Sequence, residues 1–132
     1  MIPHSYQVRV YYEDTDAGGV VYYANYLRFA ERARTEALRE AGLPHAAMHA
    51  EHGVIFMVRS VELEYLRPAR LDDVLTIRTV PLAVTGATVT LRQSFHLAEQ
   101  DIAVARIVLA CVKAASGAAA RIPLAWRKAM AA

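Results

Sequence analysis

The sequence predicts an α+β fold in which one long helix covers one face of an antiparallel sheet. One segment, residues 24–41, repeats apolar residues at helical spacing, whereas other segments alternate apolar and polar residues as half-buried strands do. The helical segment stands second in the order, after one strand and before four more. The last three strands are joined by short connections, which are typical of antiparallel hairpins. Helix and sheet together then form a layered architecture with a shared core.

The first two elements are a strand and the long helix. The strand is predicted over Tyr6–Tyr12, where apolar and polar residues alternate. The helix is expected to begin near Ala24 or Asn25 and to end near Ala41, because Gly42 supplies a stop signal. Small residues remove bulk from one helix face, so that a sheet can approach it closely: Ala30, Ala33 and Ala37.

The rest of the chain predicts four strands and two short helical segments. Because one helix covers only part of such a sheet, its edges need further cover, and self-association is the simplest remedy. The absence of repeats or linkers predicts one domain over residues 1–132. The strands are expected at 54–66, 74–84, 87–97 and 102–113, a short helix or ordered loop at 44–52, and a closing helix at 124–130.

Composition excludes several classes of protein. The formal charge is +2 and the basic residues are scattered, so nucleic-acid binding is not expected. The sequence contains no run of about 18 apolar residues, so a membrane span is not expected. The first residues lack the charged and apolar blocks of a signal peptide. The single cysteine, Cys111, allows no internal disulfide. A cytoplasmic location is therefore expected.

The densest cluster of polar residues lies directly before the long helix, in Glu13-Asp14-Thr15-Asp16-Ala17-Gly18-Gly19. Paired glycines permit close backbone approach, and the helix start behind them offers unpaired N–H groups and a partial positive charge. A carboxylate beside such an oxyanion pocket suits acyl transfer from an activated ester. Helix caps and tight turns have the same composition, so these residues permit a site without requiring one.

Other chemical signals are weak. His45, His49 and His52 have spacings of four and three, but a zinc site needs a further oriented ligand and supporting hydrogen bonds. We therefore expect a solvated helix there and no metal. The sequence has no phosphate-binding Gly-Lys-Ser loop and no dinucleotide fingerprint, so a nucleotide cofactor is not expected. It also has no Gly-x-Ser-x-Gly elbow, so an α/β serine hydrolase is not expected.

The segment 12–26, YEDTDAGGVVYYANY, closely resembles the active-site segment of the 4-hydroxybenzoyl-CoA thioesterase family. Segments 29–36 and 58–73 resemble the subgroup of that family associated with the bacterial Tol-Pal operon. The resemblance extends from about Val8 to Lys113. It implies the hotdog fold, in which a curved antiparallel sheet of five strands wraps around one long helix.

The resemblance also implies the parts of the active site. The catalytic aspartate of the family corresponds to Asp16, and the backbone N–H that polarises the thioester carbonyl belongs to Tyr23 or its immediate neighbour. The family's sites lie at subunit interfaces, so a homodimer or homotetramer is expected. No cofactor is expected. The expected substrate-binding residues surround this segment and include one strand arginine: Gly18, Gly19, Val20, Tyr22, Asn25, Tyr26 and Arg59.

Two aspects of substrate binding stay open. The tyrosines at 22, 23 and 26 suit either an acyl pocket or packing at the helix start. At position 23 the Tol-Pal subgroup frequently has His, whereas this chain has Tyr, as the hydroxybenzoyl-CoA enzymes do. The acyl preference is therefore not fixed. Phosphates of coenzyme A need cations near the surface, and the candidates form a pool: Arg59, Arg67, Arg70, Arg92 and Arg121.

The function expected from these residues is hydrolysis of acyl-CoA thioesters, with acyl carrier protein thioesters as further possible substrates. Asp16 would act as nucleophile or as general base. Two alternatives remain: a non-catalytic acyl-binding or scaffolding hotdog module, and a thioesterase for aromatic acyl-CoA.

Overall fold

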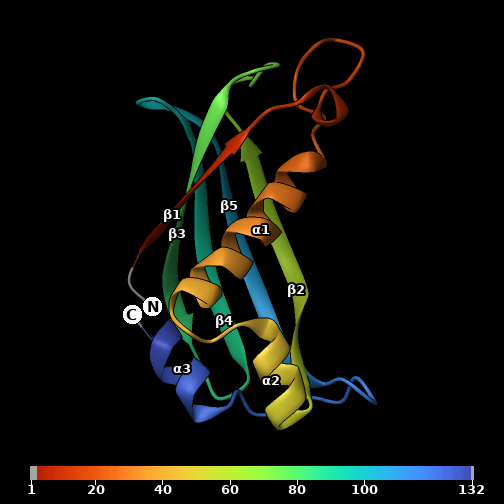
Figure 1. Cartoon of the computed structure of the whole chain (residues 1–132), viewed down its shortest axis with the longest axis vertical. Coiled ribbons are helices and arrows are strands. Elements are labelled where there is room, and N and C mark those ends of the chain that lie inside the picture. Colours follow the sequence, from red (N-terminus) through yellow and green to blue (C-terminus); the bar gives the residue numbers. More distant parts are fainter. Residues whose placement is uncertain (1–2, 132) are drawn as a thin grey trace.

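The computed structural model describes residues 3–131 and consists of a sheet with helices packed on one of its faces (Figure 1). The long helix α1 lies diagonally across the strands, and the short helices α2 and α3 lie near its C-terminal end (Figure 1). The elements, in chain order, are β1 (His4–Arg9), a 3-10 turn η1 (Tyr12–Asp14), α1 (Asn25–Glu40), α2 (His45–His52), β2 (Val54–Tyr65), β3 (Val74–Val84), β4 (Thr88–Leu97), β5 (Gln100–Lys113) and α3 (Leu124–Met130).

The sheet has five strands in the order β1-β3-β4-β5-β2, and every neighbouring pair is antiparallel. The α+β class with one five-stranded antiparallel sheet is therefore confirmed. The hairpins β3–β4 and β4–β5 join neighbouring strands, as the short connections predicted. β2 instead pairs with β5, the last strand among residues 3–131, and no other strand of this described range pairs with its other side.

The alanines of α1 allow the helix to approach the sheet. Ala30, Ala33 and Ala37 are all buried, and Ala33 is 0% exposed. Larger side chains fill the space on either side of this narrow contact, among them Phe29 from the helix and Phe95 from β4, both fully buried. Close packing of this kind leaves no room for added methylene groups.

A hydrogen-bonded polar group lies inside the core. The Gln93 side-chain amide donates to the Ala30 carbonyl and to the Thr79 hydroxyl, each at 2.9 Å. Its Oε1 accepts from the Arg34 guanidinium at 3.0 Å, and burial lowers the pKa of Arg34. Because buried polar atoms are costly unless paired, this group fixes α1 relative to β3 and β4.

The bounds of the first and last strands and the regularity of β2 differ from the prediction. The first strand ends at Arg9 instead of Tyr12, because the chain turns into η1 when the Tyr11 N–H donates to the Asp14 carboxylate at 2.9 Å. The last strand begins two residues early, at Gln100. β2 was predicted as a regular alternating strand, but its register shifts between Val58 and Ser60, and most of its side chains are exposed.

The segment left open as helix or loop is the helix α2, which Gly53 ends with φ +66. Within residues 3–131, no helix has the length and apolar character that crossing a membrane requires.

Replacing Ala33 tests the close contact between helix and sheet. We expect Ala33→Leu to lower the free energy of unfolding by about 1–3 kcal/mol, because the added side chain has no space against the sheet. Arg32→Leu, on the exposed side of the same helix, is the matched control and should change stability little. Urea unfolding followed by circular dichroism measures both; equal free energies for the two variants would contradict the packing argument.

Candidate active site

The polar segment before α1 folds back on itself as a small hairpin. The Tyr22 N–H donates to the Asp14 carbonyl at 2.8 Å, and the Asp16 N–H donates to the Val20 carbonyl at 2.9 Å. Thr15 and Val21 form an antiparallel bridge between these two contacts. Gly18 and Gly19 form the tip, where Gly19 has φ +77, a conformation that glycine adopts without strain.

The Asp16 carboxylate is exposed and is oriented by its own loop. Its Oδ1 accepts from the Gly18 N–H at 2.9 Å and from the Val20 N–H at 3.4 Å. Its Oδ2 accepts no hydrogen bond from any residue between 3 and 131. A Cβ atom at Gly18 would lie 3.2 Å from Oδ1, so a side chain there would push the carboxylate. One oxygen is therefore held while the other is available for chemistry.

Asp14 and Asn25 clamp this hairpin to the first residue of the helix. Asp14 is 9% exposed and Asn25 is 7% exposed. The Asn25 amide donates to the Asp14 carbonyl at 3.1 Å and to its Oδ1 at 3.3 Å, while Oδ2 accepts from the Tyr11 N–H. The Asn25 amide is therefore engaged within the fold, and its expected contact with substrate stays a prediction.

The N-terminus of α1 carries no side-chain cap. Ala24 occupies the cap position and has no side chain able to accept from the first helical N–H groups. The Asn25 N–H donates to the Tyr22 carbonyl. Within the described part of the chain, the Tyr23 N–H has no acceptor. An unpaired donor and the positive end of the helix dipole thus lie just after the hairpin that holds Asp16.

The tyrosines around the helix start divide into two groups. Tyr22 and Tyr23 are exposed, with ring centroids 4.8 Å apart, and a hydrogen bond from one hydroxyl to the other raises the pKa of Tyr22. Tyr26 is 3% exposed and packs edge-on against Phe95 at 5.3 Å and Tyr65 at 5.4 Å. Burial raises the pKa of Tyr26. Tyr26 is therefore part of the packing at the helix start, and its expected contact with substrate stays a prediction.

Tyr65 was missed by sequence reasoning. Its hydroxyl donates to the Tyr23 carbonyl at 2.7 Å, which ties the end of β2 to the residue whose N–H is free. Partial burial raises the pKa of Tyr65. The sequence signal was its place as the last residue of β2, on the same side of the strand as Leu63, but nothing in the pattern indicated the hydrogen bond.

The candidate arginines are spread over the molecule. Arg70 lies beside the hairpin, because its backbone forms a bridge with Val20. The other members of the pool lie elsewhere: Arg67 in the connection from β2 to β3, Arg59 at the irregularity of β2, Arg92 on the exposed side of β4, and Arg121 against Gly86 in the β3–β4 turn.

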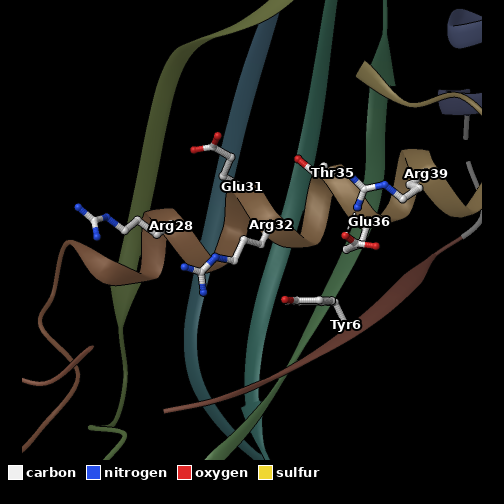
Figure 2. Close-up of a pocket in the computed structure, with 7 residues that line it drawn as sticks. All are labelled: Tyr6, Arg28, Glu31, Arg32, Thr35, Glu36 and Arg39. Carbon is white, nitrogen blue, oxygen red and sulfur yellow. Dashed lines mark hydrogen bonds and ion pairs between the residues drawn. The ribbon is translucent and has the colours of Figure 1, made fainter. Parts of the chain in front are cut away.

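Two of the hollows along α1 lie between it and neighbouring elements. One, of about 370 Å³, lies between its outward face and β1 (Figure 2), where Arg32 and Tyr6 approach from opposite sides and Arg39 pairs with Glu36. It contains none of the predicted site residues. The other, of about 380 Å³, lies between α1, α2 and the start of β2. Its lining combines apolar and titratable side chains: Glu31, Arg34, His45, Ile55, Phe56, Val58 and Leu109.

The histidines of α2 point to different neighbours. The His45 ring packs on Phe56 at 6.3 Å, and burial lowers the pKa of His45. The His52 ring packs on Trp126 at 5.5 Å. Among residues 3–131, no three His, Cys, Asp or Glu side chains are grouped as metal ligands.

The fold and this loop define a class of protein. The model of the thioesterase-like superfamily matches residues 10–130. The chain therefore belongs to the thioesterase-like superfamily. The family resemblance and the hotdog fold expected from the sequence are both confirmed.

Individual relatives are similar over most of the chain. The acyl-CoA thioester hydrolase YbgC of Escherichia coli O6:H1 is 48% identical over 106 residues, which cover 80% of this chain and 78% of that protein. A probable thioesterase from Bartonella henselae has a structure with TM-score 0.86 and 36% identity, covering 92% of this chain and 99% of the other. A mutant 4-hydroxybenzoyl CoA thioesterase complexed with 4-hydroxybenzoyl CoA shares the fold, with TM-score 0.89 at 21% identity and coverage of 99% and 100%.

A double-mutant cycle tests the clamp between the hairpin and the helix. We expect Asp14→Ala and Asn25→Ala each to lower the free energy of unfolding by about 1–3 kcal/mol, because each strands buried donors or acceptors. The double variant should lose less than the sum, by about 0.5–3 kcal/mol, since the two residues share hydrogen bonds. Urea unfolding gives all four values. Losses that simply add would show that the two side chains are not coupled.

Proposed function

We propose that this chain is an acyl-CoA thioesterase in which Asp16 attacks, or activates water against, the thioester carbonyl. The observation that carries the proposal is the free Oδ2 of Asp16 on a hairpin fixed directly before α1, where the Tyr23 N–H has no acceptor among residues 3–131. Membership of the thioesterase-like superfamily and the similarity to YbgC support thioester hydrolysis as the reaction. One hotdog domain over residues 1–132 would carry this activity.

The mechanism needs only a carboxylate and hydrogen-bond donors. In one route, an Asp16 oxygen bonds to the carbonyl carbon, the carbon–sulfur bond breaks, and coenzyme A leaves as a thiolate; water then hydrolyses the mixed anhydride. In the other route, Asp16 takes a proton from the water that attacks. In both, the Tyr23 N–H would stabilise the oxyanion, a contribution of about 3–4 kcal/mol for a good donor. A thiolate leaves readily, so no strong general acid is required.

Removing the negative charge of Asp16 tests its role. We expect Asp16→Asn to fold normally and to release free thiol from acyl-CoA at least about 100-fold more slowly, because an amide neither attacks a carbonyl nor accepts the proton of water. Glu13→Gln is the matched control: Glu13 is an exposed carboxylate in the same segment and should leave turnover near the parent value. A thiol-reactive dye follows release.

The substrate panel for this assay should contain short aliphatic, long aliphatic and aromatic acyl-CoA. Unchanged turnover in Asp16→Asn would remove Asp16 from the mechanism. Binding of acyl-CoA without turnover by the parent protein would favour an acyl-binding or scaffolding module, and a preference for aromatic thioesters would identify an aromatic acyl-CoA thioesterase.

The free edge of β2 supports a homodimer. β2 is the longer edge strand of the sheet, with 12 residues against six in β1, and within the described part of the chain only β5 pairs with it. Its side chains include apolar ones that stay exposed: Met57 is 52% exposed and Val58 is 50% exposed. An open edge with apolar side chains favours pairing with another strand. We infer that a second copy of β2 pairs here about a twofold axis.

This pairing would complete the active site. Antiparallel strands related by a twofold axis near their middle place the Val54 end of one chain beside the Tyr65 end of the other. Tyr65 is bonded to Tyr23, so the helix start of one copy would approach the 380 Å³ hollow at the beginning of β2 in the other copy. That hollow, with apolar walls and a few polar groups, has the character of a ligand pocket and would receive the acyl group.

Placing a lysine on the edge strand β2 tests the proposed pairing of two β2 strands. We expect Val61→Lys, at a site 37% exposed, to shift the mass measured by light scattering from two or four chains to one and to abolish most thiol release, because a lysine on an edge strand opposes pairing. Leu82→Lys, on β3 and 42% exposed, is the matched control. A monomer that keeps full turnover would show that each chain holds a complete site.

The remaining proposals concern partners and location. Arg70, whose backbone adjoins Val20, is the member of the arginine pool best placed to meet coenzyme A phosphates near Asp16. Acyl carrier protein carries the same thiol-ended arm as coenzyme A and would present the same thioester.

A cytoplasmic location fits the buried, unpaired Cys111. The resemblance of segments 29–36 and 58–73 to the Tol-Pal subgroup supports association with the Tol-Pal system.

A further inference from the structure

A hydrogen-bonded chain of serine, histidine and aspartate lies on the outer face of the sheet, in the β4–β5 hairpin. The Ser94 hydroxyl is 2.9 Å from Nε2 of His96, and Nδ1 of His96 is 3.0 Å from Oδ1 of Asp101. Ser94 and His96 are half-buried and point away from the core, since the intervening Phe95 and the preceding Gln93 are fully buried. The acyl-CoA site proposed above uses none of these residues.

A β-bulge brings Asp101 opposite His96. Phe95 pairs with Ala103, so a regular ladder would place Ile102 opposite His96. The register shifts at this point, and His96 pairs with Asp101 instead. The Ile102 side chain is buried, and its carbonyl accepts from the Leu66 and Arg67 N–H groups at 2.9 and 3.1 Å, which holds the bulge in place. Bulges of this kind re-aim side chains next to functional sites.

The hydrogen bonds fix the roles of the two ring nitrogens. An ionised carboxylate only accepts hydrogen bonds, so with Asp101 ionised Nδ1 of a neutral His96 carries the proton. Nε2 is then the acceptor for the Ser94 hydroxyl. The Ser94 hydroxyl thus faces Nε2 of His96, and the Asp101 carboxylate faces Nδ1. In this arrangement the imidazole can act as the base that activates a serine for acyl transfer, while the carboxylate orients the imidazole.

A cation is available where negative charge would develop. Arg78 of β3 pairs directly with Ser94, so the two side chains leave the same face about 5 Å apart at Cβ. Arg78 is exposed and forms no ion pair with any residue between 3 and 131. Its guanidinium can therefore approach an oxyanion formed at Ser94.

We infer that Ser94 is a second, acyl-accepting nucleophile, activated by His96 and Asp101, for small acyl groups on good leaving groups such as aryl esters and thioesters. Ser94 Oγ bonds to the acyl carbon while its proton passes to Nε2 of His96. The bond from carbon to the leaving group then breaks, the leaving group departs with the electron pair and takes up the proton from His96, and an acyl ester on Ser94 remains. Water, activated by the same imidazole, releases the acid slowly.

Acetylation by p-nitrophenyl acetate tests this inference in the full-length Asp16→Asn protein, so that the acyl-CoA site does not contribute. We expect one acetyl group per chain by intact mass, mapped to Ser94 by peptide analysis, and none at that position after Ser94→Ala. His96→Gln should slow the acetylation by about 100-fold or more, because the general base is lost; Asp101→Asn should slow it as well. Ser5→Ala is the matched control and should change nothing. Ser5 of β1 pairs with Arg78 as Ser94 of β4 does, but Ser5 has no hydrogen bond to a histidine among residues 3–131.

Thermal unfolding of each variant establishes that it is folded before the rates are compared. Acetylation of Ser5, tyrosines or lysines in place of Ser94, or an unchanged rate at Ser94 after both His96→Gln and Asp101→Asn, would overturn the inference and leave an ordinary surface hydroxyl. Loss of thiol release in Asp16→Asn is measured separately, so the two proposals fail independently.

Discussion

The arrangement of the site depends on a buried carboxylate that joins a loop to a helix. Asp14 accepts hydrogen bonds from the Tyr11 backbone and from the Asn25 side chain, and its carbonyl accepts from Tyr22. These bonds turn the chain away from the sheet, close the hairpin that carries Asp16, and anchor it at the first turn of α1. Because α1 is itself fixed to β3 and β4 through Gln93, the position of Asp16 follows from the packing of the core.

The elements could be predicted from the sequence wherever burial imposes a period on it. The helix over residues 25–40 has alanines and large apolar residues on one face, and buried residues alternate with less buried ones along β3 as far as Pro81 and along β4 as far as Phe95. The location of the candidate site was also accessible, because Asp16, the glycine pair and the helix start are contiguous in the chain. Its meaning came from the family resemblance, since the same residues serve equally well in a turn.

Features that depend on contacts between distant segments could not be predicted. The pairing of β2 with β5, the bulge at Ile102 and the bond from Tyr65 to Tyr23 each join residues more than 30 positions apart or require a known register. Asn25 and Tyr26 show the same limit, because their burial depends on Asp14 and on the aromatic packing around Phe95. No local pattern encodes these contacts.

The two edges of the sheet differ in a way that limits assembly. β1 is six residues long, and its outward side chains are polar: Ser5, Gln7 and Arg9. The Arg9 guanidinium also donates to the Asp72 carbonyl at 2.8 Å, across the end of that edge. Short, polar edges recruit no further strands. Strand addition would therefore be confined to the β2 side, so it would close after a single step and would not extend into a fibre.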